Sequence, residues 1–182
     1  MQTPSSAAEA ALPAALSLGP RLLAVAAQVL VGLPMADVGT DHGLLPLYLL
    51  ASGRVPRAYA LDLRPAPLKQ ARATALALGL GEAQGFFPRV SDGLAALSPG
   101  GLGTVTLAGL GGARIARVLE ASAAHLQGPE GARRVVAAPN QEVDAVRAWA
   151  VRAGWRIVHE ELVEDRARFY PVVSLEPGAG FH

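Results

Sequence analysis

The chain has 182 residues, a net charge of +1 at pH 7 and no cysteine. Without cysteine it cannot form disulfides, thiolate zinc sites or a cysteine nucleophile. No segment contains the ~18 uninterrupted apolar residues of a membrane-spanning helix, and the four histidines lack the spacing of metal ligands. We therefore expect a soluble, cytoplasmic protein of one domain that binds neither a metal nor a membrane.

The N-terminal residues 1–19 are rich in Ala, Pro and Ser, and we expect a variable segment, frayed or forming a loosely attached helix. From Pro20 apolar residues recur at helical spacing, and proline suits the first turn of a helix. Farther along, short apolar runs alternate with amphipathic segments. In chain order we predict a helix at 20–30, a strand at 35–38, a helix at 44–51, a strand at 58–61, a helix at 65–78, strands at 86–90 and 104–108, a helix at 113–125, a strand at 134–137, a helix at 143–153, and strands at 155–163 and 168–175.

Strands that alternate with helices form a parallel sheet with helices on both faces. The last two β-rich runs are joined by the polar residues 164–166, which predicts an antiparallel hairpin. This order is that of SAM-dependent methyltransferases, where the hairpin places a final antiparallel strand beside the fifth. The predicted fold is therefore α/β: a Rossmann-like class I SAM-dependent methyltransferase fold with a mostly parallel seven-stranded sheet and a C-terminal antiparallel hairpin.

The organising stretch of the chain is residues 34–46, where a short apolar strand containing Asp37 enters a glycine turn. The turn runs from Gly39 through Asp41 and His42, and a new apolar run then begins. Unpaired amides at the start of the following helix can face a ligand, and doubly wound sheets bind nucleotides at this place. The alternative is a strand-to-helix turn without a ligand.

Two further strand ends carry acidic residues. Asp62, followed by Leu63, comes 23 residues after Gly39, where a carboxylate can accept hydrogen bonds from both ribose hydroxyls of a nucleoside. Asp92 and Gly93 end the third strand and suit the adenine amino group. Each aspartate alone could cap the next helix, but three of them at consecutive strand ends favour a nucleoside site.

The segment 108–112 also follows a strand and opens a helix, and it resembles a dinucleotide glycine fingerprint. It fails at its last position, because residue 114 is Arg where the fingerprint has Gly or Ala. An NAD-dependent oxidoreductase is thus the weaker alternative. In a methyltransferase the same place, after the fourth strand, faces the methyl group and holds the target.

These motifs together resemble the bacterial tRNA adenine-N1 methyltransferases of the TrmK type, which modify adenine-22 of tRNA. The family patterns D-I-G-S-D-H-G/A-Y-L-P and G-D-G-L are similar to residues 37–46 and 91–94. The patterns A-G-M-G-G and Q-P-N are similar to residues 108–112 and 138–140. The resemblance covers nearly the whole chain from about residue 18 to 176, and it places a SAM-dependent methyltransferase domain at residues 20–182.

The chain departs from the family at a few positions. Leu44 replaces a Tyr, Asp62 replaces the usual Glu, and Gly19 replaces the Ser of an opening L-S-x-R-L. Family members also carry a helical domain after the catalytic one, and we expect this chain, which ends at His182, to lack it. A SAM-binding accessory module, or a methyltransferase-like protein without activity, is therefore kept as an alternative.

The resemblance implies S-adenosyl-L-methionine as cofactor and tRNA as partner, and a homodimer stays an open alternative. The residues implied to bind the cofactor are Arg21, Asp37, Gly39, Asp41, His42, Asp62, Leu63, Asp92, Gly93 and Ala108. Those implied to act at the target base are Asp41, Gly109, Gly111, Gly112 and Asn140. We expect the 108–112 turn to hold the base, the Asn140 amide to contact its edge, and Asp41 or His42 to accept a proton. For His42 the alternative, which we favour, is a structural hydrogen bond across the turn. We also expect four basic residues to face RNA phosphates: Arg21, Arg54, Arg64 and Lys69.

Overall fold

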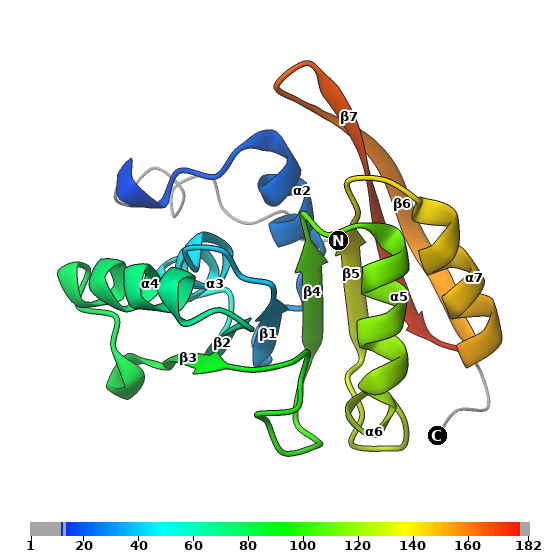
Figure 1. Cartoon of the computed structure of the whole chain (residues 1–182). Helices are drawn as coiled ribbons and strands as arrows, with labels where there is room; N and C mark the ends of the chain where they lie inside the picture. The colour runs from blue at the N-terminus through cyan, green and yellow to red at the C-terminus, as the bar shows by residue number, and fades with distance from the viewer. Residues whose placement is uncertain (1–11, 13, 179–182) are drawn as a thin grey trace.

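Seven strands form one sheet in the computed structural model, which describes residues 12 and 14–178 (Figure 1). The strands are β1 (Met35–Val38), β2 (Ala58–Asp62), β3 (Phe86–Val90), β4 (Thr104–Ala108), β5 (Arg134–Ala138), β6 (Trp155–Asp165) and β7 (Arg168–Pro177). Their order is β3-β2-β1-β4-β5-β7-β6; the first five are parallel, and β7 is antiparallel to both β5 and β6. The predicted fold class is confirmed, including the hairpin that places an antiparallel strand beside the fifth.

Helices cover both faces of the sheet and enclose two hydrophobic clusters. One face carries α2 (Pro20–Gln28), α3 (Leu44–Ala51) and α4 (Pro65–Ala77), and the other carries α5 (Gly112–Ala121), α6 (Ala123–Leu126) and α7 (Val143–Ala153). Two short 3-10 helices, η1 (Ala14–Leu16) and η2 (Glu82–Gln84), complete the elements. Because the central strands are covered on both sides, all four residues of β1 are buried.

Helix α3 is apolar around nearly its whole circumference, and six of its eight residues are buried. A helix of this composition belongs in a protein interior, and here it lies against β1 and β2. Its burial fixes the start of the helix, at Leu44, beside the glycine turn that precedes it.

Two details of the sequence-based prediction are corrected. The helix predicted at 113–125 breaks at Ser122 into α5 and α6, and the turn of α6 is held by a 2.9 Å contact between His125 Nε2 and the carbonyl of Leu97. The packed part of the chain also begins before Pro20, because Leu16 and Leu18 are buried in the first cluster. Residues 1–11 and 13 of the expected N-terminal segment lie outside the described residues.

The hairpin extends beyond the parallel sheet. Strand β7 pairs with β5 only from Val173 to Leu175, whereas its pairing with β6 continues to Arg168. Residues 161–172 therefore form an arm that projects past the carboxyl ends of the parallel strands (Figure 1). A two-residue turn, Arg166 and Ala167, closes the arm, with φ of 52° and 58°.

Candidate functional site

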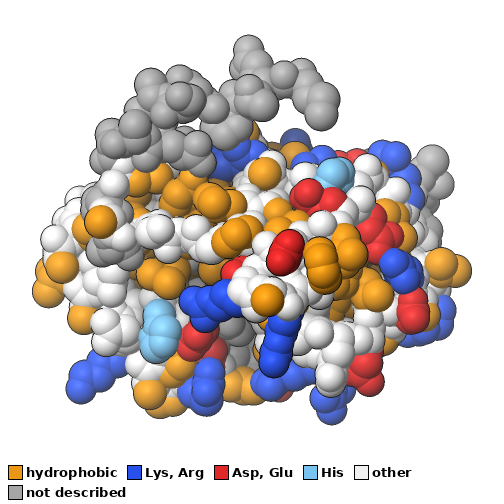
Figure 2. Space-filling view, turned by 90° about the horizontal axis from the view of Figure 1, so that it is seen from above, with side chains coloured by type: hydrophobic (Ala, Val, Ile, Leu, Met, Phe, Trp, Pro, Cys, Tyr) orange, Lys and Arg blue, Asp and Glu red, His pale blue; other side chains and the backbone are white. Residues whose placement is uncertain are grey.

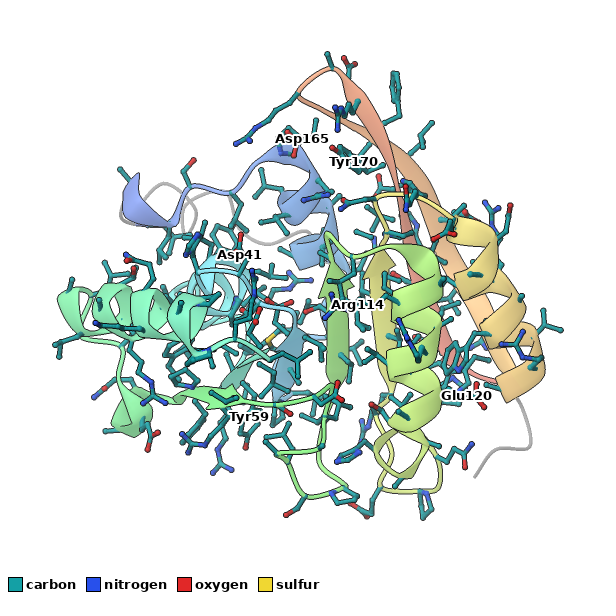
Figure 3. All side chains as sticks on the ribbon, in the orientation of Figure 1. Asp41, Tyr59, Arg114, Glu120, Asp165 and Tyr170 are labelled. Atoms are coloured by element: carbon teal, nitrogen blue, oxygen red, sulfur yellow. The ribbon has the colours of Figure 1, made fainter. Side chains whose placement is uncertain are left out.

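A cavity of about 670 Å³ opens at the carboxyl edge of the sheet, where the strand order changes direction between β1 and β4. Ligands of doubly wound sheets bind at such a switch point. Figure 3 shows Asp41 beside α3 and Arg114 on α5, on the two sides of this point, and both line the cavity. The predicted site residues that line it are Arg21, Asp37, Gly39, Asp41, His42, Asp62, Leu63, Asp92, Gly93, Ala108, Gly109 and Asn140.

The glycine turn after β1 forms one wall of the cavity. The backbone amides of Gly39 and Thr40 donate to the carbonyl of Leu61, at 2.8 and 3.0 Å, which fixes the turn against β2. Gly43 has a φ of 69°, and a side chain there would meet the β-carbon of Ala71 at 2.8 Å. Only glycine fits this position, and α3 can therefore begin directly at the cavity.

Asp37 lies beneath this turn and is 5% exposed. The Thr106 hydroxyl of the neighbouring strand donates to its Oδ1 at 2.6 Å. Burial raises the pKa of the Asp37 carboxyl, the hydrogen bond from Thr106 opposes that rise, and the negative charge of Asp62 adds to it. Asp37 thus couples β1 to β4 at the switch point.

Asp62 ends β2 and is 6% exposed. Its Oδ1 accepts hydrogen bonds from the Arg64 backbone amide at 2.8 Å and from the Arg64 Nε at 3.3 Å. These two bonds fix the orientation of the carboxylate at the cavity wall. At the end of β3, Asp92 is exposed, while the Ser91 hydroxyl donates to the Gly93 carbonyl at 2.9 Å and holds that turn closed.

A network of four residues from separate elements lies on the opposite side of the cavity. Asn140 donates from Nδ2 to the Gly109 carbonyl at 2.6 Å and accepts at Oδ1 from Arg21 at 2.7 Å. The Arg21 guanidinium also lies 4.5 Å above the ring of Tyr170, which belongs to β7. Both polar atoms of the Asn140 side chain are therefore engaged, and the amide joins the loops that follow β4 and β5.

Gly111 and Gly112 do not line the cavity. A β-carbon at Gly111 would face the side chains of Gln141 and Glu142 at 3.5 to 3.9 Å, and one at Gly112 would lie 1.9 Å from the backbone oxygen of Glu142. Gly112 thus permits a close approach of two backbones. The expected contact of these two glycines with a base stays a prediction, whereas Gly109 does border the cavity.

Arg54 was expected to face RNA phosphates, but its guanidinium is bonded to backbone carbonyls. Its Nε donates to the Val29 carbonyl at 3.0 Å, and its Nη2 donates to the carbonyls of Ala27 and Val29 at 2.7 and 2.9 Å. It therefore caps the C-terminus of α2, and it precedes β2 at the amino edge of the sheet, away from the cavity.

Sequence reasoning missed several residues of the site. Arg114 and Leu110 line the cavity, Thr106 holds Asp37, and Tyr170 holds Arg21. One signal for Arg114 was present, since it occupies the position that breaks the dinucleotide fingerprint. The contacts of Thr106 and Tyr170 join distant parts of the chain and leave no local pattern.

Charges of both signs are mixed on this face. Figure 2, viewed from above, shows blue and red side chains interspersed with hydrophobic ones. Within the described part of the chain, no group of three or more His, Cys, Asp or Glu side chains could hold a metal ion. The same residues include no helix that is long and apolar enough to cross a membrane.

Comparisons with known proteins agree with this geometry. A family model described as a methyltransferase domain matches residues 18–173. The tRNA (adenine(22)-N(1))-methyltransferase of Bacillus subtilis (strain 168) is 32% identical over 163 residues, and the chain spans 66% of its length.

Solved structures give the same result. The crystal structure of the B. subtilis m1A22 tRNA methyltransferase TrmK is similar with a TM-score of 0.83 and 32% identity, over 90% of this chain and 68% of that one. A putative tRNA (m1A22) methyltransferase of Streptococcus pneumoniae, in complex with S-adenosyl-L-methionine, has a TM-score of 0.80 and 33% identity, over 87% of this chain and 72% of that one. The resemblance found in the motifs is confirmed.

Proposed function

The chain belongs to the methyltransferase-domain family, and from this premise we propose that it transfers a methyl group from S-adenosyl-L-methionine to N1 of adenine-22 in tRNA. The observation that carries the proposal is the arrangement of strand ends around one cavity. Asp37, Asp62 and Asp92 border it from three consecutive strands of the first half of the sheet. Gly109 and Asn140 border it from the second half.

The residues of the first half fit the cofactor. Ligand cavities usually have volumes of about 300–1,000 Å³, and this one, at about 670 Å³, lies within that range. The Asp62 carboxylate is oriented by Arg64, so one of its oxygens is available to ribose hydroxyls. Asp92 can accept a hydrogen bond from the adenine amino group, and the amides at the start of α3 border the same space.

When bound, the cofactor supplies a methyl group that is already activated by its positive sulfur. Adenine N1 supplies a lone pair, and the chemistry needs no covalent enzyme intermediate. The task of the protein is therefore to align the nitrogen with the methyl carbon, and such alignment can contribute about 7–11 kcal/mol. Asp41 and His42, which are both exposed at the cavity, are placed to accept a proton once the methylated base carries a positive charge.

The second half of the site is proposed to hold the target base. A base in folded RNA must first be extruded, which costs a few kcal/mol, and is then held by stacking and edge contacts. The Ala108–Gly109 turn leaves room for a ring because its side chains are small or absent. The Asn140 amide holds the Gly109 carbonyl and Arg21 in place, and its second N–H leaves a donor for the base contact expected from the motif.

The experiment that tests the proposal is methyl transfer to unmodified tRNA transcripts, followed by mass spectrometry of the nucleosides. A transcript with guanosine in place of adenine-22 is the matched control. We expect 1-methyladenosine in the first transcript and none in the second. Calorimetry with S-adenosyl-L-methionine, S-adenosylhomocysteine and NAD separates the methyltransferase from an oxidoreductase, because only the first two ligands are expected to bind.

A second candidate function is a SAM-binding module of a larger RNA-modifying assembly. The chain spans 66% of the length of the Bacillus subtilis relative, so the activity of that whole protein is a proposal for this chain. As such a module, the chain would bind S-adenosyl-L-methionine but would methylate no tRNA on its own. The same assay decides between the two.

A further inference from the structure

We propose that the tip of the hairpin arm is an RNA-binding element, in which Arg166 and Arg168 contact phosphates and Phe169 stacks on an exposed base of the tRNA. This inference rests on the proposed function for the identity of its partner. It concerns a surface outside the cavity. The argument uses the charges of the arm, the exposure of Phe169, the turn geometry and the position of the arm.

Among the described residues no ion pair involves the two arginines of the tip, although Asp165 is opposite Arg168 and the exposed Glu164 is opposite Phe169. Glu160, adjoining the arm, receives a 2.5 Å contact from Arg147 of α7, and Glu161 lies 3.2 Å from the ring of His159. The Asp165 carboxylate lies against Gly19, the N-cap of α2, where the helix dipole favours negative charge. Arg166 and Arg168 are exposed, and no ion pair joins either of them to another described residue.

Phe169 is 62% exposed, although it lies in a regular part of the hairpin opposite Glu164. Leu162, on the same face of the arm, is 66% exposed. Phe169 follows Arg166 and Arg168 in the chain, and an exposed aromatic ring near basic side chains is typical of surfaces that bind single-stranded nucleic acid, because every base offers a face for stacking. A basic and aromatic tip therefore fits RNA better than it fits another protein.

The turn at the tip has an unfavourable backbone for its sequence. A two-residue turn with positive φ at both positions favours Asn-Gly or Gly-Gly, but this one contains Arg166 and Ala167. This turn places the exposed side chain of Arg166 at the end of the arm. Strain of this kind is tolerated where the residue has a use that is unrelated to folding.

The arm also contacts a residue that lines the cavity. Tyr170, two residues from Arg168, holds Arg21 at 4.5 Å, and Arg21 lines the cavity. At about 3.3 Å per residue along a strand, the tip lies roughly 7–13 Å beyond Tyr170. RNA bound at the tip would therefore place a nearby nucleotide at the cavity entrance.

The test is the salt dependence of tRNA binding, measured by fluorescence anisotropy with the whole chain and an unmodified transcript. We compare the double variant Arg166→Glu/Arg168→Glu with the control Arg57→Glu/Arg133→Glu. The control has the same net charge, but its two exposed arginines precede β2 and β5 at the amino edge of the sheet. Calorimetry with S-adenosyl-L-methionine and thermal unfolding are measured on each variant.

We expect the tip variant to lower the salt slope of log K by about 1.4–1.8, because each lost phosphate contact removes about 0.7–0.9, and to bind S-adenosyl-L-methionine like wild type. Phe169→Ala is expected to weaken tRNA binding about 5- to 150-fold with an unchanged salt slope, whereas Leu76→Ala, at an exposed position of α4, has no effect.

Three results would overturn the inference: equal slopes in the tip and control variants, no binding of tRNA by the wild type, or a change of oligomeric state in Phe169→Ala with unchanged tRNA affinity. The last would assign the tip to a protein contact. If the wild type binds tRNA without methylating it, only the proposed function is rejected. The salt slopes of the tip and control variants then still test whether the arm binds RNA.

Discussion

The Thr106 hydroxyl donates to the buried Asp37 carboxylate at 2.6 Å, which adds a side-chain bond to the backbone pairing of the two strands at which the sheet changes direction. Burial raises the pKa of Asp37, so the folded protein keeps this proton at a higher pH than the unfolded chain does. The stability that Asp37 contributes is therefore complete below the unfolded pKa of 3.8 and is lost as the pH rises through the folded pKa.

Asp37→Asn should remove this pH dependence. We expect the variant to become more stable relative to wild type, with a larger free energy of unfolding, as the pH rises from about 4 through the folded pKa of Asp37. Thr106→Val should shift the loss of stability to higher pH, since it deletes the hydrogen bond that favours the charged form. Urea unfolding over a pH series measures both effects, and parallel curves for all three proteins would contradict the prediction.

Asp62→Ala should weaken the binding of S-adenosyl-L-methionine, because the ribose would lose one or two charge-assisted hydrogen bonds of about 1.5–3 kcal/mol each. Calorimetry on the folded variant measures this loss. Arg64→Ala is the matched control: it removes the ion-pair partner but keeps the carboxylate and the 2.8 Å bond from the backbone amide of residue 64, so we expect a smaller loss. Equal losses in both variants would contradict the prediction that the Asp62 carboxylate, rather than the Arg64 side chain, provides most of the binding.

Gly109→Ala should reduce turnover more than Gly111→Ala does. The first adds a methyl at the cavity, 3.7 Å from Arg21 Nη2, whereas the second adds one beside Gln141 and Glu142. A misplacement of about 1 Å can cost about a hundredfold in rate. Methyl transfer per folded molecule is the measurement, together with thermal unfolding, because φ of 78° at Gly109 makes the first change strained as well. A larger loss of turnover in Gly111→Ala than in Gly109→Ala would mean that Gly111 is part of the active site.

Arg54→Ala should destabilise the fold by about 1.5–3 kcal/mol, since the guanidinium caps two carbonyls of α2. We expect no change in the salt dependence of tRNA binding. The neighbouring Arg57, which is exposed, provides the comparison: Arg57→Ala should stay within about 0.5 kcal/mol of wild type in denaturant unfolding. A reduced salt slope in Arg54→Ala would contradict this prediction and would mean that Arg54 contacts RNA phosphates.

Much of the fold could be predicted because β1 to β4 are short runs, mostly apolar, that end at or just before an aspartate or a glycine. The strand at 35–38 and the helix at 44–51 were predicted with the bounds that the structure has. The parallel order then brings Asp37, Asp62 and Asp92 to one edge without any knowledge of side-chain contacts. The position of Arg54 could also have been predicted, because a residue between a helix and the following strand lies at the amino edge.

The remaining features depend on contacts between distant segments. Local propensity favours a continuous helix through Ser122, but the structure breaks it where His125 meets Leu97. The role of Gly112 depends on the backbone of Glu142, 30 residues away, and a glycine in a turn has the same appearance whether it faces a ligand or another loop. From the sequence, Tyr170 is an ordinary strand residue, and only the fold shows that Arg21 lies over its ring.

The insertion of β7 between β5 and β6 has a consequence for synthesis on the ribosome. The strand that emerges last among the seven occupies an interior position, and until residues 168–177 are available β6 has no partner and β5 has one free edge. A nascent chain would then expose Val135, Val136 and Ala137 as an unpaired apolar edge, the kind of surface that pairs with other chains. Completion of the sheet, and with it protection from aggregation, must await the release of the final strand.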